Sequence, residues 1–199
     1  IARAYIGTKK GHFTRTSNRH DYALAPFSKT ALDSLKDAGL DVIGVGKIPD
    51  IFVDQGITRK IKTVSNEDGM NKTIELASDN FNGLAFINLV DFDAVYGHRR
   101  NAAGYGKAIE EFDVQLGELI NELKNDDLLM VTADHGNDPT YRGTDHTREQ
   151  VPLIIYSKQF NEMKVLNDSN SFGIIGSTIC DNFNVKYNGI GSSILELLK

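Results

Sequence analysis

Residues 84–90, Leu-Ala-Phe-Ile-Asn-Leu-Val, form an apolar run that only one asparagine interrupts. Shorter apolar runs occur at residues 40–44, 128–131 and 151–156. Continuous apolar runs of this length, without polar alternation, are typical of strands that are buried on both faces of a parallel sheet. We therefore expect four strands at these places.

The stretches around these runs have helical periodicity. The clearest is residues 105–123, where apolar side chains recur every three or four positions and predict one core-facing stripe: Tyr105, Ile109, Phe112, Leu116, Leu119, Ile120 and Leu123. Four further helices are expected, at residues 28–38, 67–77, 172–183 and 190–198. Alternating strands and helices predict an α/β fold, with a mostly parallel sheet flanked by helices.

The first 25 or so residues lack this alternation and carry an unusual charge. Residues 1–20 contain five basic residues and no acidic residue, whereas the whole chain of 199 residues has a net charge of -5. An acidic body with a basic start is not typical of a nucleic-acid-binding protein. It favours a small anionic ligand near the basic segment.

The cysteine content and the hydropathy of the chain indicate its cellular location. Cys180 is the one cysteine in the chain, so an intrachain disulfide cannot form, and a cytoplasmic location is expected. We expect Cys180 to be a packed apolar side chain on a helix. No apolar run is long enough to span a membrane, so we expect no membrane association.

Three of the five histidines follow predicted strands and lie among aspartates. His98 lies in residues 91–100, His135 in residues 132–138, and His146 just before the run at 151–156. Ligands of α/β folds bind beyond the carboxyl ends of strands. Imidazole and carboxylate groups without thiolate suit Mn²⁺, Zn²⁺ or Fe²⁺. The sequence therefore predicts a metal site here.

Spacing restricts how these residues can meet. Asp134 and His135 are neighbours, and neighbours in a strand point to opposite faces. For both to bind one ion, the chain must therefore leave strand geometry there. Gly136 is expected to supply the freedom for that turn. Asp93 and His98 are five residues apart, which suits a strand end followed by a loop.

Several motifs resemble the phosphopentomutase family. They are Asn-Leu-Val-Asp-Phe-Asp at 88–93, Tyr-Gly-His-Arg-Arg at 96–100, Thr-Ala-Asp-His-Gly-Asn-Asp-Pro-Thr at 132–140, Gly-Thr-Asp-His-Thr-Arg-Glu at 143–149 and Asn-Arg-His-Asp-Tyr-Ala-Leu at 18–24. Asp-His-Gly alone marks only the wider alkaline phosphatase superfamily. The two extended Asp-His blocks are much more specific.

The resemblance implies a domain division and a set of site residues. Residues 1–27 would be the end of a cap domain, and residues 28–199 the C-terminal half of an alkaline-phosphatase-like core. Two Mn²⁺ ions would be bound, one by Asp93, His98 and His146 and the other by Asp134 and His135. Cap arginines would grip the sugar phosphate; Arg3 and Arg19 match best, with Arg15 a weaker match.

The resemblance also implies an activity. Phosphopentomutases interconvert ribose 1-phosphate or deoxyribose 1-phosphate with the 5-phosphate, through a phosphothreonine and a bisphosphate intermediate. A sugar bisphosphate acts as activator, and the reaction belongs to nucleoside catabolism. The nucleophilic threonine would lie upstream of Ile1, so we expect no catalytic nucleophile among these 199 residues and no activity from them alone.

Three other interpretations remain open on the sequence. The chain could come from another enzyme of the superfamily, such as cofactor-independent phosphoglycerate mutase or a phosphatase, against which the Asp-Phe-Asp and Asp-Pro-Thr contexts argue. It could be a metal-binding module without catalysis. It could be a nucleotide-binding α/β domain, which the lack of a Gly-x-x-x-x-Gly-Lys-[Ser/Thr] phosphate loop disfavours.

Overall fold

A three-stranded parallel sheet forms the centre of the body. The structure, a computed structural model, describes residues 2–20 and 22–198, except for the side chains of Arg3 and residues 15–20. The sheet has the strand order β4-β3-β5, with bounds β3 (Asp41–Val45), β4 (Arg59–Ile61) and β5 (Gly83–Ile87). The expected α/β fold with a parallel sheet flanked by helices is confirmed.

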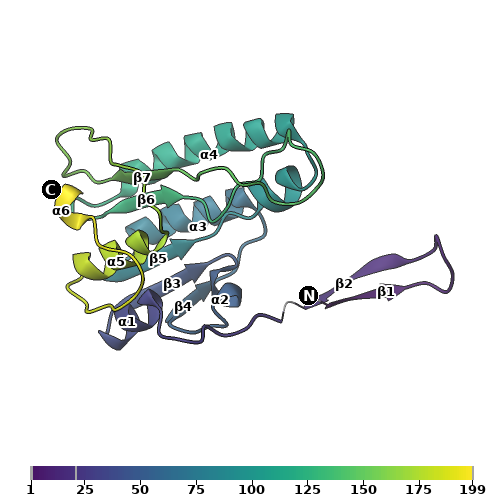
Figure 1. Ribbon diagram of the computed structural model, residues 1–199, viewed down its shortest axis with the longest axis horizontal. Coiled ribbons are helices and arrows are strands. Elements are labelled where there is room, and N and C mark those ends of the chain that lie inside the picture. Colours follow the sequence, from purple (N-terminus) through teal and green to yellow (C-terminus); the bar gives the residue numbers. More distant parts are fainter. Residues whose placement is uncertain (1, 21, 199) are drawn as a thin grey trace.

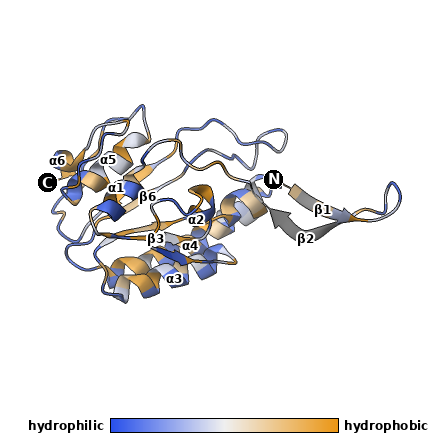
Figure 2. Ribbon diagram, turned by 90° about the horizontal axis from the view of Figure 1, so that it is seen from below, coloured by the Kyte–Doolittle hydropathy of each residue, from blue (hydrophilic) through white to orange (hydrophobic). Residues whose placement is uncertain are grey.

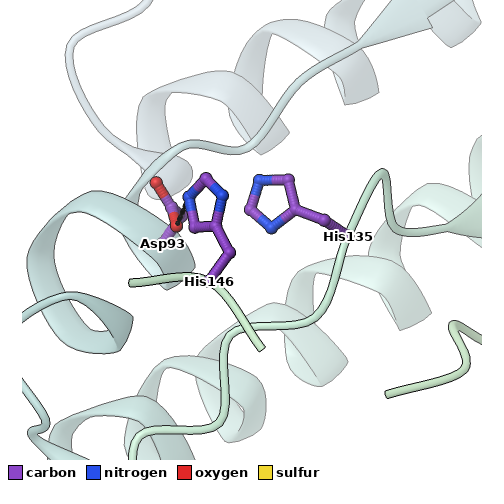
Figure 3. A group of neighbouring side chains, drawn as sticks. All are labelled: Asp93, His135 and His146. Atoms are coloured by element: carbon purple, nitrogen blue, oxygen red, sulfur yellow. Dashed lines mark ion pairs between the residues drawn. The ribbon is translucent and has the colours of Figure 1, made fainter. Parts of the chain in front are cut away.

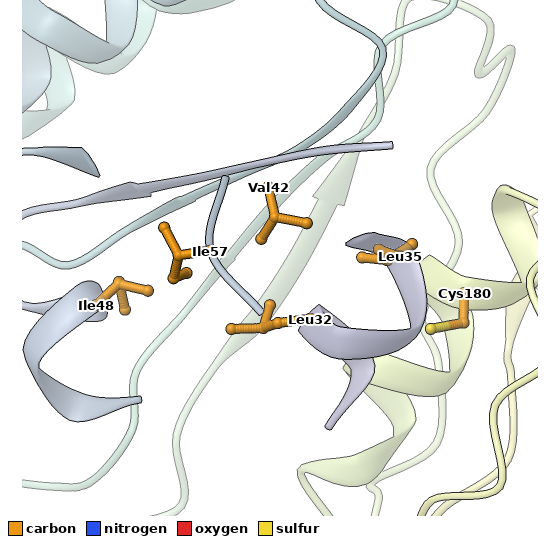
Figure 4. Packing of buried hydrophobic residues seen from close by; sticks show 6 residues of the cluster. All are labelled: Leu32, Leu35, Val42, Ile48, Ile57 and Cys180. Carbon is orange, nitrogen blue, oxygen red and sulfur yellow. The ribbon is translucent and has the colours of Figure 1, made fainter. Parts of the chain in front are cut away.

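Both faces of β3 are buried, so the sheet has a core on each side. Val42 points to one face, where it packs with residues of α1 (Ala31–Asp37), α2 (Ile48–Ile51) and α5 (Gly173–Asn182). Figure 4 shows this cluster, which consists of Leu32, Leu35, Val42, Ile48, Ile57 and Cys180. Cys180 is therefore the packed apolar side chain that the sequence predicted, and burial raises the pKa of its thiol.

The other face of β3 carries Ile43 and Val45, because alternate residues of a strand point the same way. These two residues pack with Leu76 of α3 (Asn66–Ser78), and α4 (Ala102–Glu122) lies against α3. Figure 2 shows α3 and α4 on one side of β3, with α1 and α5 on the other. This layered arrangement leaves the carboxyl ends of the strands free to carry a site.

Helix boundaries follow local capping. The first helix was expected from residue 28 but begins after Thr30, where Thr30 and Asp33 form a capping box. The last helix is shorter than expected: α6 spans only Leu195–Leu198. Gly191 has a φ of +95°, which is not helical, and its backbone lies close to Gly173, so the helix does not begin at residue 190.

The apolar stripe of α4 is largely as predicted, with one correction. Leu119 is buried and Tyr105 and Phe112 are partly buried. Ile109, however, is 49% exposed, and Ala108 takes the buried position beside it. The buried residues Ala108 and Leu119 lie on one face of the helix, and the buried stripe is centred toward them, so Ile109 falls at its edge.

The final strand pair differs from the expected parallel arrangement. β6 (Leu129–Thr132) and β7 (Leu153–Tyr156) pair antiparallel, with Leu129 opposite Tyr156 and Thr132 opposite Leu153. No helix lies between these strands in the described chain, and a parallel pair needs such a crossover. Ile154 is 61% exposed, so the expected burial of both faces is also wrong for β7.

The first residues form a separate hairpin. β1 (Ala2–Ile6) and β2 (Thr14–His20) pair antiparallel. Figure 1 shows this hairpin extending away from the α/β body, with an extended linker leading to α1. Among the described residues, no helix has the length and apolar character that crossing a membrane requires.

Candidate metal centre

The first two candidate ligands lie on a π-helix that follows β5. This element, η1 (Phe92–Gly97), carries Asp93, and His98 caps its end. The backbone N–H of His98 donates to the backbone carbonyl oxygen of Asp93 at 3.0 Å, and a hydrogen bond between residues five apart defines a π turn. The π turn therefore places the two side chains on one face. A strand end followed by a loop was expected here, and that expectation is wrong.

The other three candidates come from the segment between β6 and β7. Asp134 and His135 follow β6 directly, and His146 lies in the returning part of the segment. The two parts meet at Gly136 and Thr147, which form an antiparallel bridge. The segment thus brings His135 and His146 together although eleven positions separate them.

Gly136 has a different role from the one expected. Its φ lies outside the left-handed range, so it does not provide an unusual turn. A Cβ atom at this position would instead collide with the Glu149 side chain and lie 3.0 Å from the Glu149 backbone nitrogen. Gly136 is needed because the returning chain passes very close to it.

The five predicted side chains form one cluster, with Asp93 between two imidazole rings. Its Oδ1 lies 3.2 Å from Nε2 of His146, and its Oδ2 lies 3.4 Å from Nε2 of His98. The ligand atoms of Asp93, His135 and His146 all lie within 4.8 Å of one another. In Figure 3 the Asp93 carboxylate lies beside the His146 ring, with the His135 ring facing that ring.

This grouping differs in one respect from the sequence assignment. His135 was grouped with Asp134, whose Oδ2 lies 3.6 Å from its Nε2. Yet the His135 ring also stacks on that of His146, with centroids 3.8 Å apart. The His98 and His146 rings are 4.8 Å apart. His135 therefore lies between the two predicted groups, and the two groups are contiguous.

Backbone carbonyls fix which ring nitrogens face the cluster. Nδ1 of His98 lies 2.5 Å from the Thr144 carbonyl oxygen, and Nδ1 of His135 lies 3.2 Å from that of Gly136. A carbonyl only accepts hydrogen bonds, so each Nδ1 carries the proton when the ring is neutral. Nε2 is then left with a free lone pair, as in histidines that bind metals. The donor set fits a divalent cation.

Two further residues interact with Asp93, although the sequence predicted neither of them as a site residue. Asn137 is buried, and its Nδ2 donates to Asp93 Oδ1 at 2.7 Å. Its position directly after Asp-His-Gly was the available signal. Tyr105 of α4 also lies close to Asp93. Burial, and to a lesser extent the Asp93 charge, raises the pKa of Tyr105, so its phenol stays neutral to a higher pH than usual.

The predicted substrate arginines lie on the hairpin. The backbones of Arg3 and Arg19 are paired in register, and Arg15 is paired with Tyr5. The side chains of these three arginines lie outside the described residues, so their role stays a prediction.

Comparison with protein families and curated proteins gives a consistent result. The model of the Metalloenzyme superfamily matches residues 3–187. The chain is 58% identical over 200 residues to the phosphopentomutases of Agathobacter rectalis and of Clostridium botulinum. These alignments cover 100% of this chain but 51% and 50% of those proteins. The chain thus spans about half the length of these relatives.

A solved structure supports the fold. The body resembles the phosphoglycerate mutase of Leishmania mexicana, determined at low cobalt concentration, with a TM-score of 0.62. The match covers 85% of this chain and 39% of that chain, at 16% sequence identity. A likeness at this identity concerns the fold alone.

Proposed function

The chain belongs to the Metalloenzyme superfamily, and from this premise we propose that it corresponds to the C-terminal half of a phosphopentomutase. The observation that carries the proposal is the identity of 56–58% to four phosphopentomutases along the whole chain. The substrates would be pentose 1-phosphates and 5-phosphates. The enzyme would act in nucleoside catabolism. A cytoplasmic location would agree with the single cysteine of the chain.

The Asp and His cluster is proposed to hold two Mn²⁺ ions. Asp93, His98 and His146 would hold one, and Asp134 and His135 would contribute to the other. When bound, the two cations would stabilise the negative charge on the phosphoryl group during its transfer. The chain's own contribution is to present Nε2 of His98 and of His135, because a backbone carbonyl holds the proton on each Nδ1.

The reaction would exchange phosphate between the enzyme and the sugar. A phosphothreonine donates its phosphoryl group to the free hydroxyl of a pentose phosphate, which gives a bisphosphate. Return of the other phosphoryl group to the threonine releases the isomer, and a sugar bisphosphate would activate the enzyme. We place this threonine in the part of the relatives that precedes this chain, because no family motif for it matches residues 1–199.

The hairpin is proposed to be the end of a cap domain over the site. Residues 1–27 would form this part and residues 28–199 the core. The separation of the hairpin from the body supports the division, as does the lack of helix and strand at residues 22–30. Arg3, Arg15 and Arg19 would bind the substrate phosphate, since a guanidinium offers a planar fork of donors. A closed cap would also exclude water from the phosphoryl group.

A hybrid enzyme tests this function. Residues 1–199 would be fused behind the preceding half of the Agathobacter rectalis phosphopentomutase, with which they share 58% identity. With Mn²⁺ and a sugar bisphosphate, the hybrid should isomerise ribose 1-phosphate and leave phosphoglycerate unchanged. A folded hybrid that acts on phosphoglycerate but not on the pentose phosphate would refute the proposal.

The role of Arg19 gives a second test in the same hybrid. A charge-assisted contact to phosphate is worth roughly 1.5–3 kcal/mol, so Arg19→Ala should lower kcat/KM about 10- to 100-fold. Lys29→Ala is the control: it removes a positive charge from the body, where Lys29 forms an exposed ion pair with Asp37. Equal kinetics of the Arg19 variant and the parent would show that Arg19 does not bind the phosphate.

A further inference from the structure

Arg100 has an unusual backbone conformation next to the candidate metal centre. It follows His98 by two residues and has a φ of +53°. Residues with a side chain seldom adopt this left-handed conformation, and they keep it only where the surroundings hold them there. Its side chain is partly buried rather than free in solvent. The contacts of the Arg100 guanidinium group therefore show what surrounds this residue and holds its backbone.

The guanidinium group is enclosed by oxygen atoms of the segment that returns to β7. Nε donates to the Gly143 carbonyl at 2.6 Å, and Nη2 donates to the Asp145 carbonyl at 2.6 Å. Nη1 lies within hydrogen-bond distance of Asn137 Oδ1 at 2.6 Å and of the Asp138 carbonyl at 3.1 Å. It also donates to the Gly97 carbonyl at 2.9 Å, the same oxygen that accepts from the Arg100 backbone N–H at 3.0 Å.

These acceptors adjoin the proposed ligands. Asn137 donates to Asp93, so the contact from Arg100 orients the amide that holds this carboxylate. Gly143 and Asp145 flank Thr144, whose carbonyl oxygen lies 2.5 Å from Nδ1 of His98. Asp145 also immediately precedes His146. One side chain thus contacts the supports of three proposed ligands.

We propose that Arg100 is a positioning residue, which fixes residues 137–146 against η1 so that Asp93, His98 and His146 converge. This inference rests on the proposed metal role of the cluster. A planar guanidinium is suited to the task because its donors point in several fixed directions at once. Outer partners of metal ligands commonly alter metal affinity about 10- to 100-fold when they are replaced.

The test uses Arg100→Gly in the 199-residue chain. Glycine adopts positive φ without strain, so this variant removes the guanidinium while it keeps the backbone conformation. The affinity for Mn²⁺ alone is measured by electron paramagnetic resonance of the free ion. Hydrogen exchange of residues 137–146 is measured without metal. We expect affinity to fall about 10- to 100-fold and exchange in this segment to accelerate, while exchange in α3 and α4 is unchanged.

Two further variants sharpen the result. Arg100→Lys keeps a charge but cannot reach several acceptors at once, so it should recover only part of the affinity. It also serves as the test if Arg100→Gly fails to fold. Arg99→Gly is the matched control. The Arg99 side chain is exposed and makes no polar contact with the described residues, so the affinity for Mn²⁺ should stay within about twofold of the parent.

The outcomes separate this inference from the proposed function. If the parent chain binds no Mn²⁺, the proposed metal site is wrong, and the role of Arg100 falls with it. If the parent binds Mn²⁺ and Arg100→Gly or Arg100→Lys binds it equally well, the metal site stands and the role of Arg100 is refuted. Equal losses in the Arg99 and Arg100 variants would also refute it.

Discussion

Asp93→Asn should lower the Mn²⁺ affinity of the chain by about 100-fold or more. Asp93 is the carboxylate between two rings, with Oδ1 3.2 Å from Nε2 of His146 and Oδ2 3.4 Å from Nε2 of His98. Asparagine keeps the size of the side chain but removes its charge. Because replacement of outer partners alone costs about 10- to 100-fold, loss of a ligand should reach or exceed the upper end of that range.

Two measurements check this expectation. A titration with Mn²⁺ gives the affinity directly, and thermal unfolding with and without Mn²⁺ gives the stabilisation that binding provides. Asp91→Asn is the control: Asp91 lies two residues earlier, outside the cluster, and its Oδ2 accepts from the Asn66 N–H at 2.7 Å, which an amide oxygen can still do. If the two variants bind Mn²⁺ equally well, Asp93 is not a ligand.

The fold could be predicted from the sequence where burial is strong. β3 is recognisable because buried apolar residues fill both of its faces, and α4 because its apolar stripe is long. β5 is recognisable as an apolar run, although it is only partly buried. β4 was missed because Arg59, Lys60 and Ile61 form a short edge strand with little burial. The antiparallel pairing of β6 with β7 was missed, although the lack of a helical pattern between them was a usable sign.

The residue types of the site were predictable, but their supports were not. Asp93, His98, Asp134, His135 and His146 were predicted as ligands from position and motif. The structure brings them together, and their role as ligands stays a prediction. The π turn that aligns Asp93 with His98 has no sequence signature. The contacts of Asn137 and Arg100 depend on chain segments about forty residues apart, and no local pattern reveals such contacts.

Residues 1–199 alone should not isomerise ribose 1-phosphate, whereas the hybrid enzyme should. The proposed nucleophile comes from the preceding half of the relatives, and without a nucleophile the phosphoenzyme route is lost. Loss of a nucleophile reduces turnover by several orders of magnitude, so the rate should be at least about 10³-fold below that of the hybrid. Both proteins are assayed with Mn²⁺ and a sugar bisphosphate, and circular dichroism verifies that each is folded.

Turnover by the chain alone near that of the hybrid would contradict this prediction and place the nucleophile within these residues. The threonines near the cluster would then be the first candidates. Two of them have hydroxyl groups that are already engaged: Thr132 donates to the Pro152 carbonyl at 2.8 Å, and Thr140 donates to Asp138 Oδ1 at 2.7 Å. A hydroxyl held as a donor to a carbonyl or carboxylate must break that contact before it can attack a phosphoryl group. Thr132→Val and Thr140→Val would therefore be compared with Thr144→Val, and only replacement of the true nucleophile should abolish the phosphoenzyme.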